Sequence, residues 1–460
     1  MKNIAYKSGH LFTYFLLICQ PSFGFSAGST NTLKLKTTPY IFGQAALDKA
    51  SENPAYKNMI VGSHGFVQVP LDYSNPASAK TPIFYRIPGG IDPLKQNLLF
   101  FYGGPGGNST GLTLEDRLKN FNVIYFDQRG TGFSRPPRLE DLQNPKLFSS
   151  EFIAKDAKML LDTLGVKKVS VYGHSYGTVV ATVFANRFSD VVNSVVLEGV
   201  VFDGTSDLWI NPDRLKTTQA FYDSLSSDLK IKIDEFTKLN KVPNDWLSRF
   251  IQKSMVGNNF SSYVSQVLNT LPNRTADDFA SQITSEIDDS FMYEDSFTFG
   301  AYMYHNISCQ ELSLAEADSA GSYFLQQGKF VPNHADSKAI CSQIPGMEAL
   351  LNKTTFYATN YPLSMKVTYF QGLDDGATGA NNAAEHFKSV AKNSADIIVM
   401  PNKGHGPILS CLSISKYDPN PIMCNNLDKI VVLVESALQG NRISEGEIKN
   451  IDQTWLVQSH

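Results

Sequence analysis

The sequence predicts an α/β fold in which a mostly parallel sheet of eight strands is flanked by helices and interrupted by a helical insertion. Short apolar segments alternate with helical patterns, which is typical of parallel strands joined by crossover helices. The chain has 460 residues, enough for one large domain with an insertion. Between about Asp203 and Tyr361 polar, helix-like sequence replaces the strand pattern, and this stretch is too long for a plain loop.

Eight segments are predicted strands because they are short, rich in β-branched or aromatic residues, and bounded by Gly, Pro or Asn. They are Gly65–Tyr73, Thr81–Ile87, Asn97–Phe101, Val123–Phe126, Val169–Tyr172, Val192–Leu197, Met365–Gln371 and Asp396–Met400. Helical patterns cover Ser150–Leu164, Thr178–Phe188, Ala380–Ala391 and Asn426–Leu438. We therefore divide the chain into a signal peptide (1–27), a first core segment (28–202), a helical cap insertion (203–361) and a second core segment (362–460).

The composition is that of an ordinary globular protein, with 42% hydrophobic residues, 18% charged residues and a net charge of −4. No block of five or six like charges occurs in the sequence. We therefore expect no nucleic-acid partner.

The N-terminus predicts export. Lys2 and Lys7 precede an apolar run over residues 11–19, and small residues follow at 24–29, as in a cleavable signal peptide. The run is shorter than the roughly 20 residues of a membrane span, so we expect no stable membrane anchor and a periplasmic or secreted protein. Lipid attachment at Cys19 is a weaker alternative, because the residue before it is not small.

Removal of this signal leaves an even number of cysteines, Cys309, Cys341, Cys411 and Cys424. In an exported chain this predicts two disulfides. Three pairings are possible, and we favour Cys309 with Cys341 and Cys411 with Cys424 because each closes a short loop. Four buried free thiols are the alternative. No Cys-x-x-Cys or paired histidine spacing occurs, so no metal or other cofactor is expected.

A Gly-His-Ser-Tyr-Gly segment, Gly173–Gly177, lies between a predicted strand and a predicted helix. This is the context of a nucleophile elbow, a turn so sharp that its serine has a strained backbone and its glycines make room for it. The pattern occurs often by chance, but its placement favours Ser175 as a nucleophile.

A glycine-rich segment, Tyr102–Gly107, follows the third predicted strand. Backbone amides in such a loop stabilise the oxyanion that forms during acyl transfer. We expect the amides of Gly104 and Tyr176 to form the oxyanion hole. A tight turn that binds no ligand is the alternative.

A serine nucleophile requires a base and a group that orients the base. His405 is the best-placed of the eight histidines, because it follows the last predicted strand, whereas His174 is expected to point elsewhere from inside the elbow. For the acid we prefer Asp375, after the strand before it, with Asp374 as an open alternative. The order Ser, Asp, His is that of the α/β-hydrolase fold.

These motifs resemble the prolyl aminopeptidase and tripeptidyl aminopeptidase family of α/β-hydrolases. The resemblance rests on Tyr102–Gly107, on Asp127–Ser134, on Val67–Tyr73 and on Gly404–Gly406 before Cys411, and it covers roughly residues 60 to 440. It implies a serine exopeptidase, closed by a helical cap, that removes residues from free peptide N-termini.

The sequence departs from the family pattern at several positions. Tyr102 replaces the usual histidine of the glycine loop, Glu198 replaces a familiar aspartate, and little of the cap can be matched. Because an aminopeptidase must hold a protonated amine, we expect Glu311, and secondarily Glu198, to bind substrate. Solvation of acidic side chains is the alternative. In Asp127–Ser134, Asp127 and Arg129 either contact substrate or pin the loop by a buried salt bridge.

The predicted function is an exported serine aminopeptidase that forms an acyl-enzyme from peptides with a free N-terminus. An esterase or lipase with the same Ser-Asp-His residues is the first alternative, and a catalytically silent binding protein is the second. An epoxide hydrolase is disfavoured because its nucleophile is an aspartate, where this chain has Ser175.

Overall fold

The structure is a computed structural model that describes residues 40–52, 62–109, 112–239, 246–271, 300–317, 337–413 and 424–460. The predicted signal peptide at 1–27 lies outside the described residues. Within the described ranges, no helix combines the length and the apolar character needed to cross a membrane.

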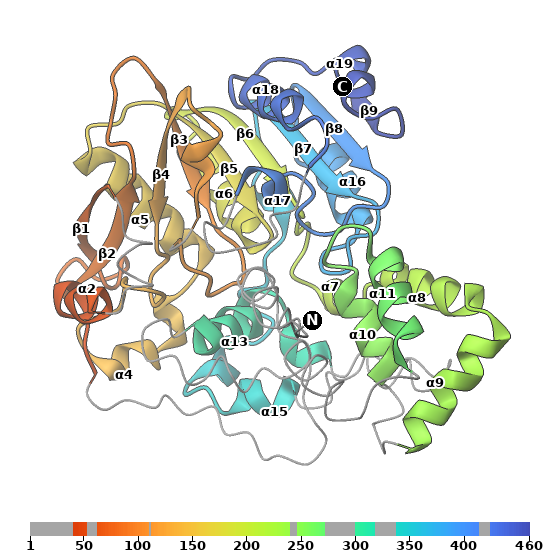
Figure 1. The fold of residues 1–460 in the computed structure, drawn as a ribbon. Coiled ribbons are helices and arrows are strands. Elements are labelled where there is room, and N and C mark those ends of the chain that lie inside the picture. Colours follow the sequence, from red (N-terminus) through yellow and green to blue (C-terminus); the bar gives the residue numbers. More distant parts are fainter. Residues whose placement is uncertain are drawn as a thin grey trace, which may run out of the picture.

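One twisted sheet of nine strands forms the centre of the molecule, in the order β1-β2-β4-β3-β5-β6-β7-β8-β9 (Figure 1). Neighbouring strands from β4 through β3, β5, β6 and β7 to β8 are parallel, whereas β1–β2, β2–β4 and β8–β9 are antiparallel pairs. The strands are β1 (Ser63–Pro70), β2 (Lys80–Ile87), β3 (Gln96–Phe101), β4 (Phe121–Phe126), β5 (Val169–His174), β6 (Val192–Glu198), β7 (Lys366–Gly372), β8 (Ala395–Met400) and β9 (Leu456–Ser459).

Each of the eight predicted strands overlaps an observed strand, so the mostly parallel α/β fold is confirmed. The predicted number of eight strands is wrong by one, because β9 pairs with β8 at the edge of the sheet, with Val457 opposite Ile398. This strand has four residues whose side chains alternate between exposed and half-buried. Such a short edge strand has no apolar run by which it could be recognised.

Helices cover both faces of the sheet because its central strands are apolar on both sides. All six residues of β4 and of β5 are buried. One face packs with α5 (Ser150–Thr163), α6 (Tyr176–Arg187) and α16 (Ala380–Ser389). The other face packs with α18 (Leu427–Leu438) and α19 (Glu445–Ile451). Two smaller helices are α2 (Gly43–Ser51) and α4 (Leu139–Leu142).

Between β6 and β7 the described chain is helical (Figure 1). Four of these helices pack around an apolar cluster of their own that includes Phe221, Trp246, Phe250 and Phe260. The helices are α7 (Ser206–Ile210), α8 (Pro212–Ser224), α9 (Ser227–Leu239), α10 (Trp246–Ser254), α11 (Phe260–Asn269), α13 (Gly300–Glu311) and α15 (Ser337–Ser342). The domain boundaries given above stay predictions.

The cysteines form the two favoured pairs. Cys309 of α13 is bonded to Cys341 of α15, and Cys411 of α17 (Leu409–Leu412) to Cys424, each with a Cα–Cα distance of 5.6 Å. The first pair joins two helices of the insertion. The second lies close to His405 in the sequence.

Candidate active site

Ser175 occupies the turn between β5 and α6 with φ 56° and ψ −130°. This backbone conformation is strained for any residue other than glycine. The two glycines beside it are required by space, because a Cβ on Gly173 would lie 2.6 Å from the carbonyl oxygen of Gly177. A Cβ on Gly177 would lie 2.0 Å from the carbonyl oxygen of Phe101. The turn therefore has the geometry of a nucleophile elbow.

The glycine-rich loop touches the side chain of Ser175. A Cβ added to Gly103 would lie 2.6 Å from Cβ of Ser175 and 3.2 Å from its Oγ. The Gln128 side chain holds the start of this loop by donating to the Tyr102 carbonyl oxygen at 2.7 Å. Gly104 follows Gly103, which contacts Ser175, and Tyr176 directly follows Ser175. The oxyanion hole formed by the amides of Gly104 and Tyr176 stays a prediction.

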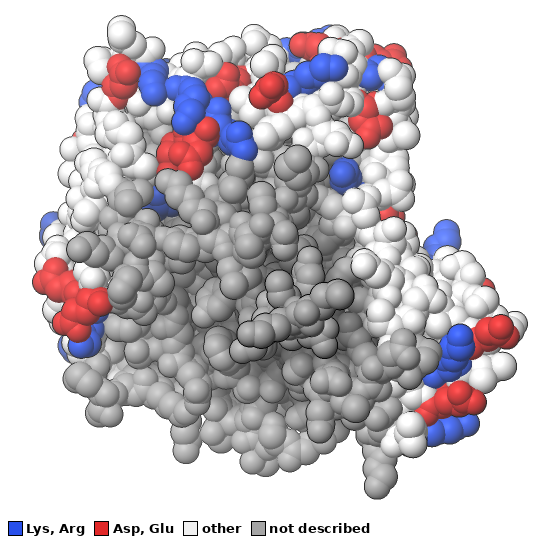
Figure 2. All heavy atoms as spheres, viewed as in Figure 1, with Lys and Arg blue, Asp and Glu red and all other residues white. Residues whose placement is uncertain are grey.

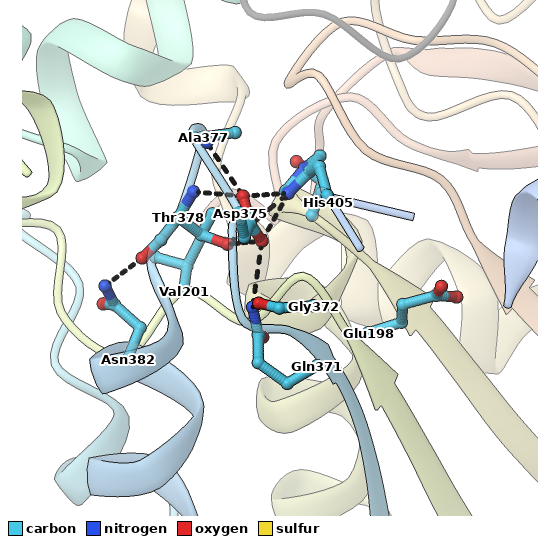
Figure 3. A network of polar contacts seen from close by, with 12 residues as sticks. Glu198, Val201, Gln371, Gly372, Asp375, Ala377, Thr378, Asn382 and His405 are labelled. Carbon is cyan, nitrogen blue, oxygen red and sulfur yellow. Dashed lines mark hydrogen bonds and ion pairs between the residues drawn. The ribbon is translucent and has the colours of Figure 1, made fainter. Parts of the chain in front are cut away.

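Asp375 and His405 form a buried pair at the ends of β7 and β8 (Figure 3). The Nδ1 atom of His405 lies 2.9 Å from Oδ2 of Asp375 and 3.0 Å from its Oδ1. Burial by itself would raise the pKa of Asp375, but the His405 ring and the hydrogen-bond donors lower it overall. Of the two aspartates considered from the sequence, Asp375 contacts the histidine, while Asp374 is half-buried beside it.

Four hydrogen-bond donors besides His405 hold the Asp375 carboxylate, and none of them was predicted from the sequence. Oδ1 accepts from the backbone N–H of Ala377 at 2.8 Å and of Thr378 at 3.0 Å. Oδ2 accepts from the Thr378 hydroxyl at 2.8 Å and from the Gln371 amide at 3.1 Å (Figure 3). The Asp-Gly-Ala-Thr turn was the available signal, because a carboxylate often caps the N–H groups two and three residues after it.

Glu198 and Gly199, at the end of β6, lie between Ser175 and His405 as neighbours of both. Among the described residues, the Nε2 atom of His405 is buried and has no hydrogen-bond partner. A Cβ on Gly199 would lie 2.7 Å from Cε1 of His405, and the residue before Gly199, Glu198, accepts the N–H of Ser175 through its carbonyl oxygen at 2.9 Å. Catalytic hydrogen bonds are often long in enzymes without substrate.

His174 corrects one expectation. Its side chain was expected to point elsewhere, but its ring packs against the ring of His405 with a centroid distance of 4.8 Å. Burial lowers the pKa of His174 to about 3, so this ring is neutral near pH 7. The elbow therefore gives the base a neutral, close-packed neighbour.

Glu198 anchors the chain that follows His405. Its Oε1 accepts from the backbone N–H of Ile408 at 2.6 Å and of Leu409 at 3.0 Å, and the Tyr172 hydroxyl donates to Oε2. Burial raises the pKa of Glu198 to about 7 in spite of these donors. In Figure 3 its carboxylate points away from the Asp375–His405 pair. All these contacts are with the protein itself, and the role of Glu198 in substrate binding stays a prediction.

Glu311, at the end of α13, is buried and bonded to residues of the core. Its Oε1 accepts from both the N–H and the hydroxyl of Ser150 at 2.9 Å, and its Oε2 accepts from the Tyr176 hydroxyl at 2.7 Å. It is 4% exposed, so it is not the solvated acidic side chain of the alternative interpretation. Burial raises the pKa of Glu311 to about 7. Glu311 thus links the insertion to the residue that follows Ser175, and its contact with substrate stays a prediction.

The raised pKa of Glu311 predicts a pH-dependent stability. Because the folded protein holds the proton up to about pH 7, compared with about 4.5 for the free group, the wild type should lose stability as pH rises through this window. Glu311→Gln keeps the hydrogen-bonding shape and cannot titrate, so it should lack this loss. Urea unfolding at pH 5 and pH 8 should show the variant gaining on the order of 1 to 3 kcal/mol relative to wild type at the higher pH. An equal difference at both pH values would contradict this expectation.

Asp127 and Arg129 hold loops in place. Arg129 forms a buried salt bridge with Asp156, with an N–O distance of 2.6 Å, and also donates to the carbonyl oxygens of Leu71 and Leu147 at 2.9 Å. Asp127 accepts from the N–H and hydroxyl of Ser109 and from the N–H of Phe133, all at 2.9 Å. The contacts of both side chains fit the loop-pinning interpretation. The described ranges contain no group of three His, Cys, Asp or Glu residues arranged to hold a metal ion.

Comparison with known proteins agrees with this geometry. Residues 96–226 match the model of the alpha/beta hydrolase fold family. The chain has the α/β-hydrolase fold. The matched residues include the glycine loop, the elbow and Ser175.

Curated relatives of the chain include aminopeptidases. It is 31% identical over 155 residues to a proline iminopeptidase of Aeromonas sobria, covering 30% of this chain and 36% of the relative. It is 24% identical over 181 residues to a proline iminopeptidase of Lactobacillus acidophilus, covering 33% and 60%. It is 25% identical over 197 residues to a tripeptidyl aminopeptidase of Streptomyces lividans, covering 32% and 36%. The matches therefore span between about a third and three fifths of the length of these relatives.

Proposed function

We propose that this α/β-hydrolase is an exported serine aminopeptidase that releases residues or short peptides from free peptide N-termini. The Ser175 hydroxyl attacks the scissile carbonyl carbon while Nε2 of His405 accepts its proton, and the proton then passes to the leaving amine. Water hydrolyses the resulting acyl-enzyme by the same route in reverse. Asp375 keeps the histidine in the tautomer whose Nε2 accepts a proton, and the amides of Gly104 and Tyr176 stabilise the oxyanion.

One observation carries the proposal: a strained serine lies against a glycine-rich loop, and the end of β6 contacts both this serine and the histidine of a buried Asp–His pair. Strain of this kind persists only where the surrounding structure holds it, and it is concentrated at functional sites. The low pKa of Asp375 keeps its carboxylate ionised, as the orienting residue of a serine hydrolase must be.

Glu311 supports an aminopeptidase rather than an esterase. It is a carboxylate whose Oε2 is hydrogen-bonded to the side chain of the residue directly after Ser175. A protonated substrate amine would gain a charge-assisted hydrogen bond from such a group. The similarity to proline iminopeptidases and a tripeptidyl aminopeptidase supports the same substrate class.

Export is supported by the basic and apolar N-terminal pattern together with two disulfides in the structure. Disulfides persist mainly in oxidising compartments. A periplasmic or secreted location belongs to the proposal on these grounds.

A comparison of three substrates tests the function. The wild type should cleave an aminoacyl nitroanilide with a free N-terminus and should not cleave the same anilide after N-acetylation. A short-chain nitrophenyl ester provides the third substrate. Equal cleavage of both anilides would contradict recognition of a free amine, and cleavage of the ester alone would favour the esterase alternative.

Glu311→Gln should separate the two activities. We expect kcat/KM for the free anilide to fall at least about tenfold, because a charge-assisted hydrogen bond contributes about 1.5 to 3 kcal/mol. Hydrolysis of the ester should stay within about twofold of wild type, because the ester has no protonated amine for Glu311 to bind. Glu151→Gln is the matched control, because Glu151 is a partly exposed carboxylate paired with Arg187 on the surface. A parallel loss of both activities in Glu311→Gln would show that Glu311 does not recognise the amine.

A further inference from the structure

The connection between α10 and α11, residues Met255–Asn259, contacts both loops that carry the proposed acid and base. The N–H of His405 itself donates to the carbonyl oxygen of Val256 at 2.9 Å. The N–H of Gly376, next to Asp375, donates to the carbonyl oxygen of Met255 at 3.3 Å. This short connector of the insertion is therefore hydrogen-bonded both to the loop of Asp375 and to the loop of His405.

Two glycines beside the pair are shaped to this connector. A Cβ on Gly404 would lie 2.4 Å from the carbonyl oxygen of Val256. A Cβ on Gly376 would lie 2.6 Å from Cβ of Met255. Side chains essentially never approach so closely, so each glycine lets backbone pack directly on the connector.

The Asn258 side chain is hydrogen-bonded to residues before and after His405. Its Oδ1 accepts from the N–H of Gly404 at 3.1 Å, and its Nδ2 donates to the hydroxyl of Ser410 at 3.1 Å. Gly404 directly precedes His405, and Ser410 lies in α17 after it. One half-buried side chain from the insertion thus fixes the loop on both sides of the base.

Arg214 of α8 contacts the acid loop from the same insertion. Its Nη1 donates to the carbonyl oxygen of Gly376 at 2.9 Å, and its Nη2 donates to the carbonyl oxygen of Trp209 at 2.7 Å. The acid loop is therefore held by two separate parts of the insertion.

We infer that Asn258 is a positioning residue of the hydrolase and that the connector Met255–Asn259 sets the geometry of the Asp375–His405 pair. This inference rests on the proposed serine-hydrolase function. Fixing the loop at 404 and 410 limits how far the His405 ring can move from Ser175. Small displacements of a catalytic group cost up to about a hundredfold in rate, so the effect falls on the chemical step rather than on substrate binding.

Asn258→Ala in the full-length protein tests the inference. We expect kcat for the anilide and for the ester to fall at least about tenfold, with KM within about twofold for each. Labelling of Ser175 by a fluorophosphonate should slow by a similar factor. Asn258→Asp should restore kcat to within about threefold, because a carboxylate oxygen still accepts from Gly404 and the Ser410 hydroxyl can donate to the other oxygen.

Asn269→Ala is the matched control, since the Asn269 side chain donates only to Ser265 within α11. Ser410→Ala removes one of the two Asn258 contacts and should lower kcat by about threefold, so it provides the test if Asn258→Ala fails to fold. The inference would be overturned if Asn258→Ala left kcat unchanged, raised KM alone, or was not rescued by Asn258→Asp. If Asn258→Ala does not fold, an unchanged kcat in Ser410→Ala would overturn it. A wild type that reacts with neither substrate nor probe would instead refute the proposed function.

Discussion

Ser175→Ala is expected to lower kcat on every substrate of this protein by on the order of 10⁴ to 10⁶-fold, with the fold intact. Loss of the nucleophile leaves only the oxyanion hole and binding to accelerate the reaction, as measured in other serine hydrolases. Alanine removes one oxygen at a turn that is already close-packed, so the melting temperature should change little. Fluorophosphonate labelling of the variant should be absent.

The control for this substitution lies at the other end of α6. Ser189, just beyond the end of α6, is exposed, and Ser189→Ala should have wild-type activity and labelling. If Ser175→Ala kept more than a few per cent of wild-type activity, another nucleophile would be at work and the catalytically silent interpretation of this elbow would gain weight.

Asp375→Asn is expected to lower kcat by about 10⁴-fold, the size of effect seen when the orienting acid of a serine hydrolase becomes an amide. An asparagine would place either a donor amide or a neutral oxygen against Nδ1 of His405. With its N–H directed at Nδ1, the asparagine would favour the tautomer with its proton on Nε2, and such a ring cannot accept the proton of Ser175. It would also remove the negative charge that stabilises the imidazolium formed in the reaction.

Asp374→Asn is the matched comparison, because it makes the same chemical change one residue earlier. Asp374 is half-buried and its pKa is raised by burial, whereas Asp375 is bonded to the histidine. We expect Asp374→Asn to retain activity within about twofold, because it leaves the bonds between Asp375 and His405 in place. The reverse pattern, with Asp374→Asn inactive and Asp375→Asn active, would reassign the acid.

The strands could be predicted because their signals are local. Val169–His174 is a short apolar run buried on both faces, and such runs are recognisable without neighbours. The strand β9 was missed since its four residues carry no apolar pattern and become a strand only by pairing with β8. The side chain of His174 was misjudged for a related reason: the direction of its ring depends on where the loop of His405 lies.

Local sequence patterns were enough to predict the elbow around Ser175, the glycine loop and the loops of Asp375 and His405. Each of these depends on a few consecutive residues whose backbone needs can be read in order. The groups that hold these segments depend on long-range packing: Glu198 accepts from the loop after His405, Glu311 accepts from the Tyr176 hydroxyl, and Asn258 bonds to the residues that flank His405. These contacts join positions more than a hundred residues apart, and several use backbone atoms that every residue has. Such partners leave no pattern in the linear chain, because what makes them neighbours is the packing of the insertion on the sheet.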